Sequence, residues 1–260
     1  MIKNVKNNID LTIGKVSGEL NIGGLVSFAS GNSQILSCSN NGFVNVIDLT
    51  ASNKTVVGGI VSNNSGNLLI RDSYNTGDLK YGWRVGGIAG GVITDDAILV
   101  MDRCYNTGLI NGILNTASGA NVHTGGLIGL LWTANTSSTA YIINSYNVGD
   151  VYSGTFRDAG GLVGSVATKG KGYFINSYNA GNITSQKSTS MAAGIANYSA
   201  SGSLKFVSNN VFNFGTVVGV KSAHGIGYMS NKNYTIINTY YNNANSGSNY
   251  SVGVGMPITS

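Results

Sequence analysis

The chain has 260 residues, with 38 glycines, one proline and only 10% charged residues. With 42% apolar residues this is not the composition of a disordered chain. The net charge of +5 comes from scattered lysines, which argues against nucleic-acid binding, because such proteins gather their cations in one stripe. No stretch approaches the ~20 apolar residues of a membrane span, so no membrane insertion is expected.

The elements predicted in chain order begin with half a unit. The stretch before Asp10 carries lysines and no apolar core, so it is no signal peptide, and residues 7–11 resemble the second half of a repeat. We therefore expect a fragment of a larger protein, with one domain over 1–260. The array of repeats is expected over about residues 20–245, and 246–260 are expected to be a C-terminal tail or cap.

Two blocks recur about every 33 residues, and a fixed period of this length indicates a stacked array. The second block is close to Ser-Tyr-Asn-x-Gly, as at Ser73–Gly77 and Ser145–Gly149. The first block is Gly-Gly-aliphatic and stands at Gly23-Gly24-Leu25, Gly58-Gly59-Ile60, Gly86-Gly87-Ile88, Gly125-Gly126-Leu127 and Gly160-Gly161-Leu162, with weaker copies at Ala193-Gly194-Ile195 and His224-Gly225-Ile226.

The fifth copy shows how one unit should fold. Residues 160–164 form a short strand bracketed by glycines, residues 173–179 form a second strand rich in β-branched and aromatic residues, and residues 182–184 form a third. Three short strands and three corners make one coil, so the sequence predicts an all-β parallel β-helix, a β-solenoid, of about seven coils. Equivalent aliphatic residues should stack in columns; one column is Leu25, Ile60, Ile88, Leu127, Leu162, Ile195 and Ile226, and a second is Val44, Leu79, Ile110, Val151, Ile183 and Val217.

The Ser-Tyr-Asn block breaks strict alternation. Both faces of a regular strand would be mixed there, so a corner or bulge is expected inside the block. The small Ser/Cys column is expected to point inward, with Cys38 and Cys104 as free thiols, because two coils of about 4.8 Å each separate them and a disulfide needs Cα atoms within about 7 Å. The tyrosine column is then expected outside or at a corner, and it would offer an aromatic ladder for binding if exposed: Tyr74, Tyr105, Tyr146 and Tyr178.

Charges support this alignment. Arg71 and Asp102 occupy one position in adjacent coils, and Asp72 and Arg103 occupy the next. Opposite charges would therefore meet in both columns, one pair on each face, where like charges would repel.

These blocks resemble a known repeat family. Gly-Gly-Leu-Val-Gly followed by Ile-Asn-Ser-Tyr-Asn-x-Gly is similar to the GLUG repeat of bacterial surface and secreted proteins, over about residues 20–245. Such repeats occur in adhesin-like proteins and beside the peptidase domain of IgA1-type metalloproteases. The resemblance implies a right-handed parallel β-helix with an extracellular or cell-surface location. It implies no single ligand, and the chain has no His-Glu-x-x-His motif.

Little in the sequence points to catalysis or cofactors. The only histidines, His123 and His224, lie about three coils apart and cannot share a metal, so neither a metal nor a cofactor is expected. Adjacent Asp95 and Asp96 fit a loop turn better than a glycosidase pair. We therefore expect no enzyme and assign no catalytic residue.

One constellation suggests a binding surface. Arg84, His123 and Asp158 each stand two residues before the Gly-Gly block of consecutive repeats. With aromatic and charged neighbours they would form a patch suited to a sugar or a protein surface. The candidate binding residues are Trp83, Arg84, His123, Phe156, Arg157 and Asp158; the alternative is that unequal loops splay apart and Trp83 packs locally.

The sequence thus favours a non-catalytic, surface-exposed β-solenoid that acts as an adhesin or stalk. We expect a monomer that binds a host surface protein or glycan, and no nucleic acid. The first alternative is a carbohydrate-active β-helix enzyme, a polysaccharide lyase or glycoside hydrolase. The second is a component of a phage tail or other trimeric fibre.

Overall fold

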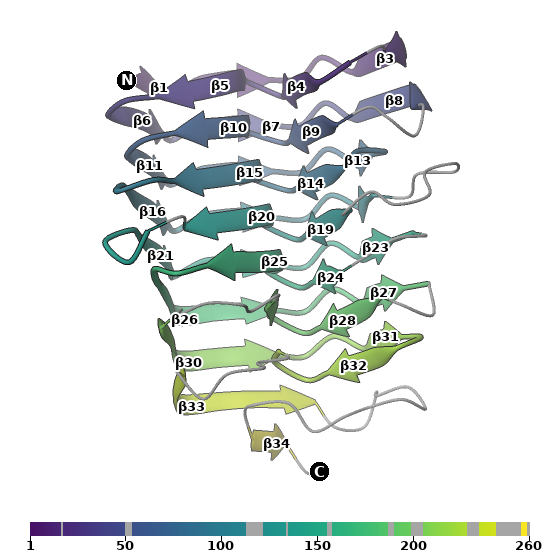
Figure 1. The fold of residues 1–260 in the computed structure, drawn as a ribbon. Helices are drawn as coiled ribbons and strands as arrows, with labels where there is room; N and C mark the ends of the chain where they lie inside the picture. The colour runs from purple at the N-terminus through teal and green to yellow at the C-terminus, as the bar shows by residue number, and fades with distance from the viewer. Residues whose placement is uncertain are drawn as a thin grey trace.

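A computed structural model describes residues 1–16, 18–49, 54–112, 122–133, 135–154, 158–186, 190–198, 205–227, 234–242 and 256–258. All elements in these ranges are β-strands, and the strand pairs between neighbouring coils are parallel. The coils stack in sequence order, with the two termini at opposite ends of the stack (Figure 1). The predicted parallel β-solenoid is confirmed.

Four sheets, here named A to D, run along the stack. In chain order each coil crosses sheets C, D, A and B, and it usually crosses sheet A as two segments.

The first segments of sheet A are β1 (Ile2–Lys3), β6 (Ser33–Leu36), β11 (Leu68–Arg71), β16 (Ile98–Asp102), β21 (Thr139–Ile143), β26 (Lys171–Asn179), β30 (Lys205–Asn213) and β33 (Tyr234–Asn242). The second segments are β2 (Lys6–Asn7), β7 (Ser39–Asn40), β12 (Tyr74–Asn75), β17 (Tyr105–Asn106), β22 (Tyr146–Asn147) and β34 (Met256–Ile258), which pairs with the end of β33. In β26, β30 and β33 the two segments are continuous, so these strands span both halves of the sheet.

Sheet B comprises β3 (Leu11–Val16), β8 (Val44–Leu49), β13 (Leu79–Lys80), β18 (Ile110–Asn111), β23 (Val151–Ser153), β27 (Ile183–Ser185) and β31 (Val217–Gly219). Sheet C comprises β4 (Leu20–Gly23), β9 (Thr55–Gly58), β14 (Arg84–Gly86), β19 (His123–Gly125), β24 (Ala159–Gly160), β28 (Met191–Ala193) and β32 (Ser222–His224). Sheet D comprises β5 (Val26–Ser30), β10 (Val61–Ser65), β15 (Ala89–Thr94), β20 (Ile128–Thr133), β25 (Val163–Thr168) and β29 (Ala196–Tyr198).

The Gly-Gly block corrects the expectation of three strands per coil. The block is a corner between sheets C and D, since β9 ends at Gly58 and β10 begins at Val61. A Cβ atom on Gly58 would lie 1.9 Å from the Val61 carbonyl oxygen, and one on Gly59 would lie 2.1 Å from the Gly87 carbonyl oxygen. The bend is so tight that only glycine fits, which turns the predicted single strand into two strands on different sheets.

The array also extends beyond the expected limits of 20–245. Strands β1, β2 and β3 pair with the following coil, so the array begins at Ile2. At the other end β34 pairs with β33, so part of the predicted tail continues sheet A.

The core is divided into two clusters of buried apolar residues. Val57, directly before the second Gly-Gly block, belongs to one cluster, and Ile60, directly after it, belongs to the other. Gly58-Gly59 lies between them in the chain. On the opposite wall of the coil, Asn75 separates the side that carries Ile70 from the side that carries Leu79. A Cβ on Gly59 would lie 2.5 Å from Asn75 Cγ, so the two walls touch there. We call this contact the waist of the coil.

A buried ladder of asparagines runs along the waist. In each of six consecutive steps one side-chain amide donates from Nδ2 to Oδ1 of the equivalent asparagine in the next coil, over 2.7–2.8 Å. Each Nδ2 also donates to the carbonyl oxygen two residues further on, as Asn75 does to Gly77 over 2.7 Å. The members are Asn7, Asn40, Asn75, Asn106, Asn147, Asn179 and Asn213. The ladder satisfies polar groups that would be costly to bury unpaired.

The expected irregularity inside the Ser-Tyr-Asn block is a residue in the left-handed conformation. Asp72 has φ +52°, and it lies between Arg71, which points outward, and Ser73, which is buried. Two successive residues therefore point outward before alternation resumes. The same conformation recurs at Asn4, Ser37, Asp72, Arg103, Asn144, Asn176, Asn210 and Asn238, which we call the left-handed column.

The predicted columns are in register, and their members are buried except Leu25, which is partly buried. The Leu25 to Ile226 column lies in one core cluster and the Val44 to Val217 column in the other. The Ser/Cys column points inward as expected, and Cys38 and Cys104 are free, buried thiols. Burial raises the pKa of Cys104 to about 12, so this thiol stays protonated in the folded protein.

Candidate functional site

The structure places three of the predicted site residues in one column on sheet C. Arg84 pairs in register with His123 on the adjacent strands β14 and β19. Asp158 precedes β24, whose Ala159 pairs with Thr124, so Asp158 lies in the same column. The fixed distance of these residues from the Gly-Gly corner produces this alignment. Phe156 and Arg157 lie outside the described residues.

His123 and Asp158 lie in the interior of this part of the molecule. Their side chains are 8% and 4% exposed, and His123 Nδ1 lies 4.0 Å from Asp158 Oδ2. The Met191 backbone N–H donates to Asp158 Oδ1 over 3.4 Å, which links the carboxyl group to the next coil. The exposed flank that the sequence suggests therefore does not include these two side chains.

Trp83 and Arg84 form the accessible part of this column. The Arg84 guanidinium lies 3.9 Å from the Trp83 ring centroid, a cation–π contact, and Lys54 lies 6.0 Å from the same ring. Lys54 in turn forms an ion pair with Glu19 over 2.9 Å. Burial lowers the pKa of the Arg84 guanidinium to about 10, while Glu19 acts in the opposite direction. One face of the tryptophan ring is thus covered by an intramolecular cation.

The tyrosine column forms a stacked ladder on the outer face of sheet A. Ring centroids are 4.8 Å apart for Tyr74–Tyr105, 5.0 Å for Tyr105–Tyr146 and 4.9 Å for Tyr146–Tyr178. The planes are within 4° of parallel, and each ring is partly buried. Burial together with the neighbouring tyrosines raises the pKa of Tyr105, and burial with Tyr146 raises that of Tyr178.

This geometry decides what the ladder can offer to a ligand. Face-to-face stacking along the solenoid means that the rings between Tyr74 and Tyr178 cover one another's faces. A sugar or a base stacks on an aromatic face, and such faces are occupied here. The ladder therefore presents ring edges and hydroxyl groups.

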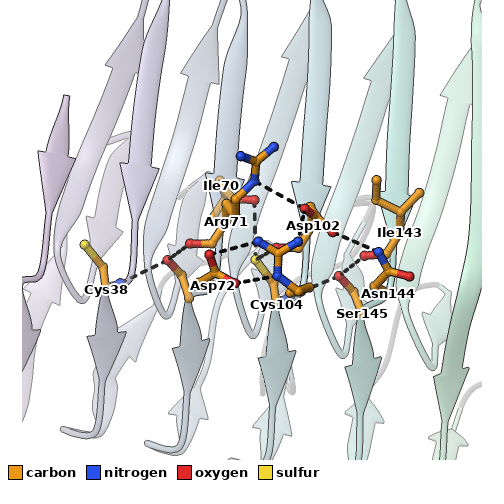
Figure 2. A network of polar contacts seen from close by, with 11 residues as sticks. Cys38, Ile70, Arg71, Asp72, Asp102, Cys104, Ile143, Asn144 and Ser145 are labelled. Atoms are coloured by element: carbon orange, nitrogen blue, oxygen red, sulfur yellow. Dashed lines mark hydrogen bonds and ion pairs between the residues drawn. The ribbon is translucent and has the colours of Figure 1, made fainter.

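A polar network crosses the left-handed column (Figure 2). Asp102 forms ion pairs with Arg71 over 3.2 Å and with Arg103 over 2.7 Å, and it accepts a hydrogen bond from Asn144 Nδ2 over 3.0 Å. Arg103 also binds Asp72 over 2.6 Å. The predicted pairs Arg71–Asp102 and Asp72–Arg103 are thus present. The sequence predicted one pair on each face, but both pairs lie on the outer face. The left-handed residue turns both columns outward, so the two pairs join into one network.

Amides continue this network toward the C-terminus. Asn176 donates to Asn144 over 3.3 Å, Asn210 to Asn176 over 3.1 Å, and Asn238 to Asn210 over 3.1 Å. This exposed ladder was missed from the sequence. Its signal was an asparagine directly before the Ser, Val or Thr that opens each later block. The chain needs a left-handed residue at this position, and asparagine tolerates that conformation.

Five aspartates outside this network also have structural partners. Asp10, Asp78 and Asp150 each accept the backbone N–H of the equivalent corner residue in the next coil, over 3.0, 3.0 and 2.8 Å. Asp95 and Asp96 accept hydrogen bonds from the side chain of Asn135, and Asp96 also accepts one from Ser137. These aspartates join adjacent coils.

Among the residues that the structure describes, no three His, Cys, Asp or Glu side chains come close enough to hold a metal ion. No helix long and apolar enough to cross a membrane is present among the same residues.

Comparisons with known proteins show the fold alone. No family model matches the chain, and no curated protein matches it. A crystal structure described as a "putative immunoglobulin A1 protease" from Bacteroides ovatus, at 1.30 Å resolution, has a similar fold with a TM-score of 0.53 and 16% identity, and the match covers 98% of this chain and 67% of that chain. The resemblance to GLUG repeats consequently stays a resemblance of motifs.

Proposed function

We propose that the chain is a non-catalytic β-solenoid module of a bacterial surface or secreted protein. It serves as a stalk and binds a host protein or a glycan along one flank. The observation that carries the proposal is the outer face of sheet A, where Tyr146 and Asn144 of one coil repeat in register as Tyr178 and Asn176 of the next. Solenoids use such repeated surfaces for extended contacts.

The internal ladders support the stalk part of the proposal. Six successive hydrogen bonds between side-chain amides at the waist join each coil to its neighbours, and a core cluster runs along the stack. Each bond crosses from one coil to the next, so bending or separating coils would break buried hydrogen bonds. A module built in this way transmits force along its axis.

The roles of the aspartates favour binding over catalysis. A glycosidase needs one carboxyl group as acid and another as base or nucleophile, both free to reach the sugar. Asp78 and Asp150 accept backbone N–H groups of the next coil, and Asp102 is held by Arg71 and Arg103. Groups engaged in this way support the coil stack.

The test is an array of glycans and host proteins probed with the full chain, with Tyr146→Ala as the variant, because Tyr146 lies in the stacked ladder on the outer face of sheet A. Trp132→Ala is the matched control, because Trp132 is an exposed aromatic residue on sheet D. We expect binding by the native chain, weaker binding by Tyr146→Ala, and native binding by Trp132→Ala.

Three results would change the proposal. No binding to any glycan or host protein on the array would leave a spacer without a ligand. Loss of binding in Trp132→Ala alone would move the surface to sheet D. Cleavage of a polysaccharide by the native chain, measured as new reducing ends or unsaturated products, would favour the carbohydrate-active enzyme.

A further inference from the structure

Charge is distributed unevenly along the solenoid. Up to Asp158 the sequence has nine Lys and Arg and ten Asp and Glu. After Asp158 it has no Asp or Glu and six lysines, which are Lys169, Lys171, Lys187, Lys205, Lys221 and Lys232. The five ion pairs between Lys or Arg and Asp or Glu in the described residues all lie before residue 159. The sequence after Asp158 therefore carries positive charge and no acidic side chain.

Two of these lysines stand directly opposite each other. Lys171 on β26 pairs in register with Lys205 on β30, and both side chains are exposed on the outer face of sheet A. Within the described part of the chain neither forms an ion pair. Like charges at adjacent positions of neighbouring strands are destabilising. Elsewhere on this face the chain places opposite charges in that relation, as in Arg71 and Asp102.

A third cation lies beside this pair. Lys169 is exposed in the turn that precedes β26, and the Lys205 backbone N–H donates to the carbonyl of Gly170 in the same turn over 3.0 Å. The turn thus holds Lys169 near the pair. Two residues along the strands, the rings of Tyr141 and Tyr173 stack at 4.9 Å on the same outer face.

We propose that Lys169, Lys171 and Lys205 bind an acidic glycan, one that carries carboxylate or sulfate groups. The glycan would lie along the solenoid axis across β21, β26 and β30, where its anionic groups offset the repulsion between the lysines. Hydroxyl groups of Tyr141 and Tyr173 supply polar partners next to the cations. This inference rests on the proposed binding function and gives it a ligand class.

The same surface is less suited to a nucleic acid. Single strands bind to stacking platforms, and bases need open aromatic faces. The rings of Tyr141 and Tyr173 are only 11° from parallel and cover one another. An acidic glycan can bind through its charged groups and hydrogen bonds without stacking on an aromatic face.

The experiment measures binding of the full chain to dextran sulfate and to alginate, with neutral dextran as the control ligand. The variant is Lys171→Ala/Lys205→Ala. The matched control is Lys221→Ala, which removes an exposed lysine of the same half between β31 and β32, on the opposite side of the coil (Figure 1). We expect binding to one or both acidic glycans that weakens with salt, and an affinity about tenfold lower in the double variant. Lys221→Ala should bind like the native chain.

Thermal unfolding of the double variant should be unchanged or shifted upward, since the substitution relieves repulsion. Equal loss of binding in Lys221→Ala would overturn the site in favour of diffuse attraction. Complete displacement by single-stranded DNA at equal charge concentration would point to a nucleic-acid partner instead. Binding to neutral glycans or host proteins without binding to either polyanion would reject this inference and leave the proposed function standing.

Discussion

Replacing Asn106 by alanine tests whether the buried ladder holds the coils together. Asn106 makes three buried hydrogen bonds: Nδ2 donates to Gly108 O and to Asn147 Oδ1, each over 2.8 Å, and Oδ1 accepts from Asn75 Nδ2 over 2.7 Å. At about 1 kcal/mol net for each bond, their loss removes about 3 kcal/mol.

The partners left behind raise this cost. The amide of Asn75, the side-chain oxygen of Asn147 and the carbonyl of Gly108 remain buried near the waist, and an unsatisfied buried group costs about 1–3 kcal/mol. Some of these groups regain partners by small shifts, so we expect Asn106→Ala to lower the free energy of unfolding by about 3–5 kcal/mol.

The assay is urea unfolding followed by circular dichroism, with the midpoint and slope compared between variants. Thr107→Ala is the matched control, because Thr107 is the exposed next residue of the same unit and should change stability by less than about 0.5 kcal/mol. A loss in Asn106→Ala below about 1 kcal/mol at unchanged slope would refute the structural role of the ladder.

Two other predictions address the corner and the charge network. Gly59→Ala would place Cβ 2.1 Å from Gly87 O and 2.5 Å from Asn75 Cγ, so it should lower the free energy of unfolding, measured in urea, by more than about 3 kcal/mol. Gly14→Ala is the control and should be neutral, because nothing lies within 4 Å of its Cβ. Equal effects of the two substitutions would contradict the close contact at the waist. The hydrogen bond from Arg103 holds the pKa of Asp72 below its usual 3.8, so the contribution of this pair is complete above the unfolded-state pKa and is lost as the pH falls through the folded-state pKa. Carboxyl titration by NMR should move the Asp72 pKa upward in Arg103→Asn, a change that suits the left-handed position; an unmoved pKa would show that Arg103 is not the cause.

The repeat could be predicted because every coil of a solenoid carries the same sequence pattern. The Leu25 to Ile226 column and the free thiols Cys38 and Cys104 followed from alignment of the copies alone. The left-handed column was foreseen only as an irregularity, since mixed faces reveal a bulge without showing which residue forms it. Its effect on Arg71 and Asp72, which both face outward, depends on that residue.

The waist escaped prediction for a different reason. Asn75 and Gly59 lie on opposite walls of a coil, and one copy of the repeat does not show that the walls touch. The available signal was that asparagine stays at this position while its neighbours vary, which a surface residue has no need to do. The burial of His123 and Asp158 could not be read from spacing either, because spacing fixes a column and leaves its depth open.

The waist ladder also makes coils interchangeable. Each internal asparagine accepts one hydrogen bond from the coil before it and donates one to the coil after it. At the first member the Ile9 N–H donates to Asn7 Oδ1 over 3.0 Å, so the N-terminal acceptor is filled by the coil's own backbone. Removing or adding one whole coil leaves the same donor at one end and the same closed acceptor at the other. The length of such a rod can therefore change by complete coils without leaving a buried asparagine amide unpaired. Adding or removing part of a coil would interrupt the hydrogen bonds between successive asparagines.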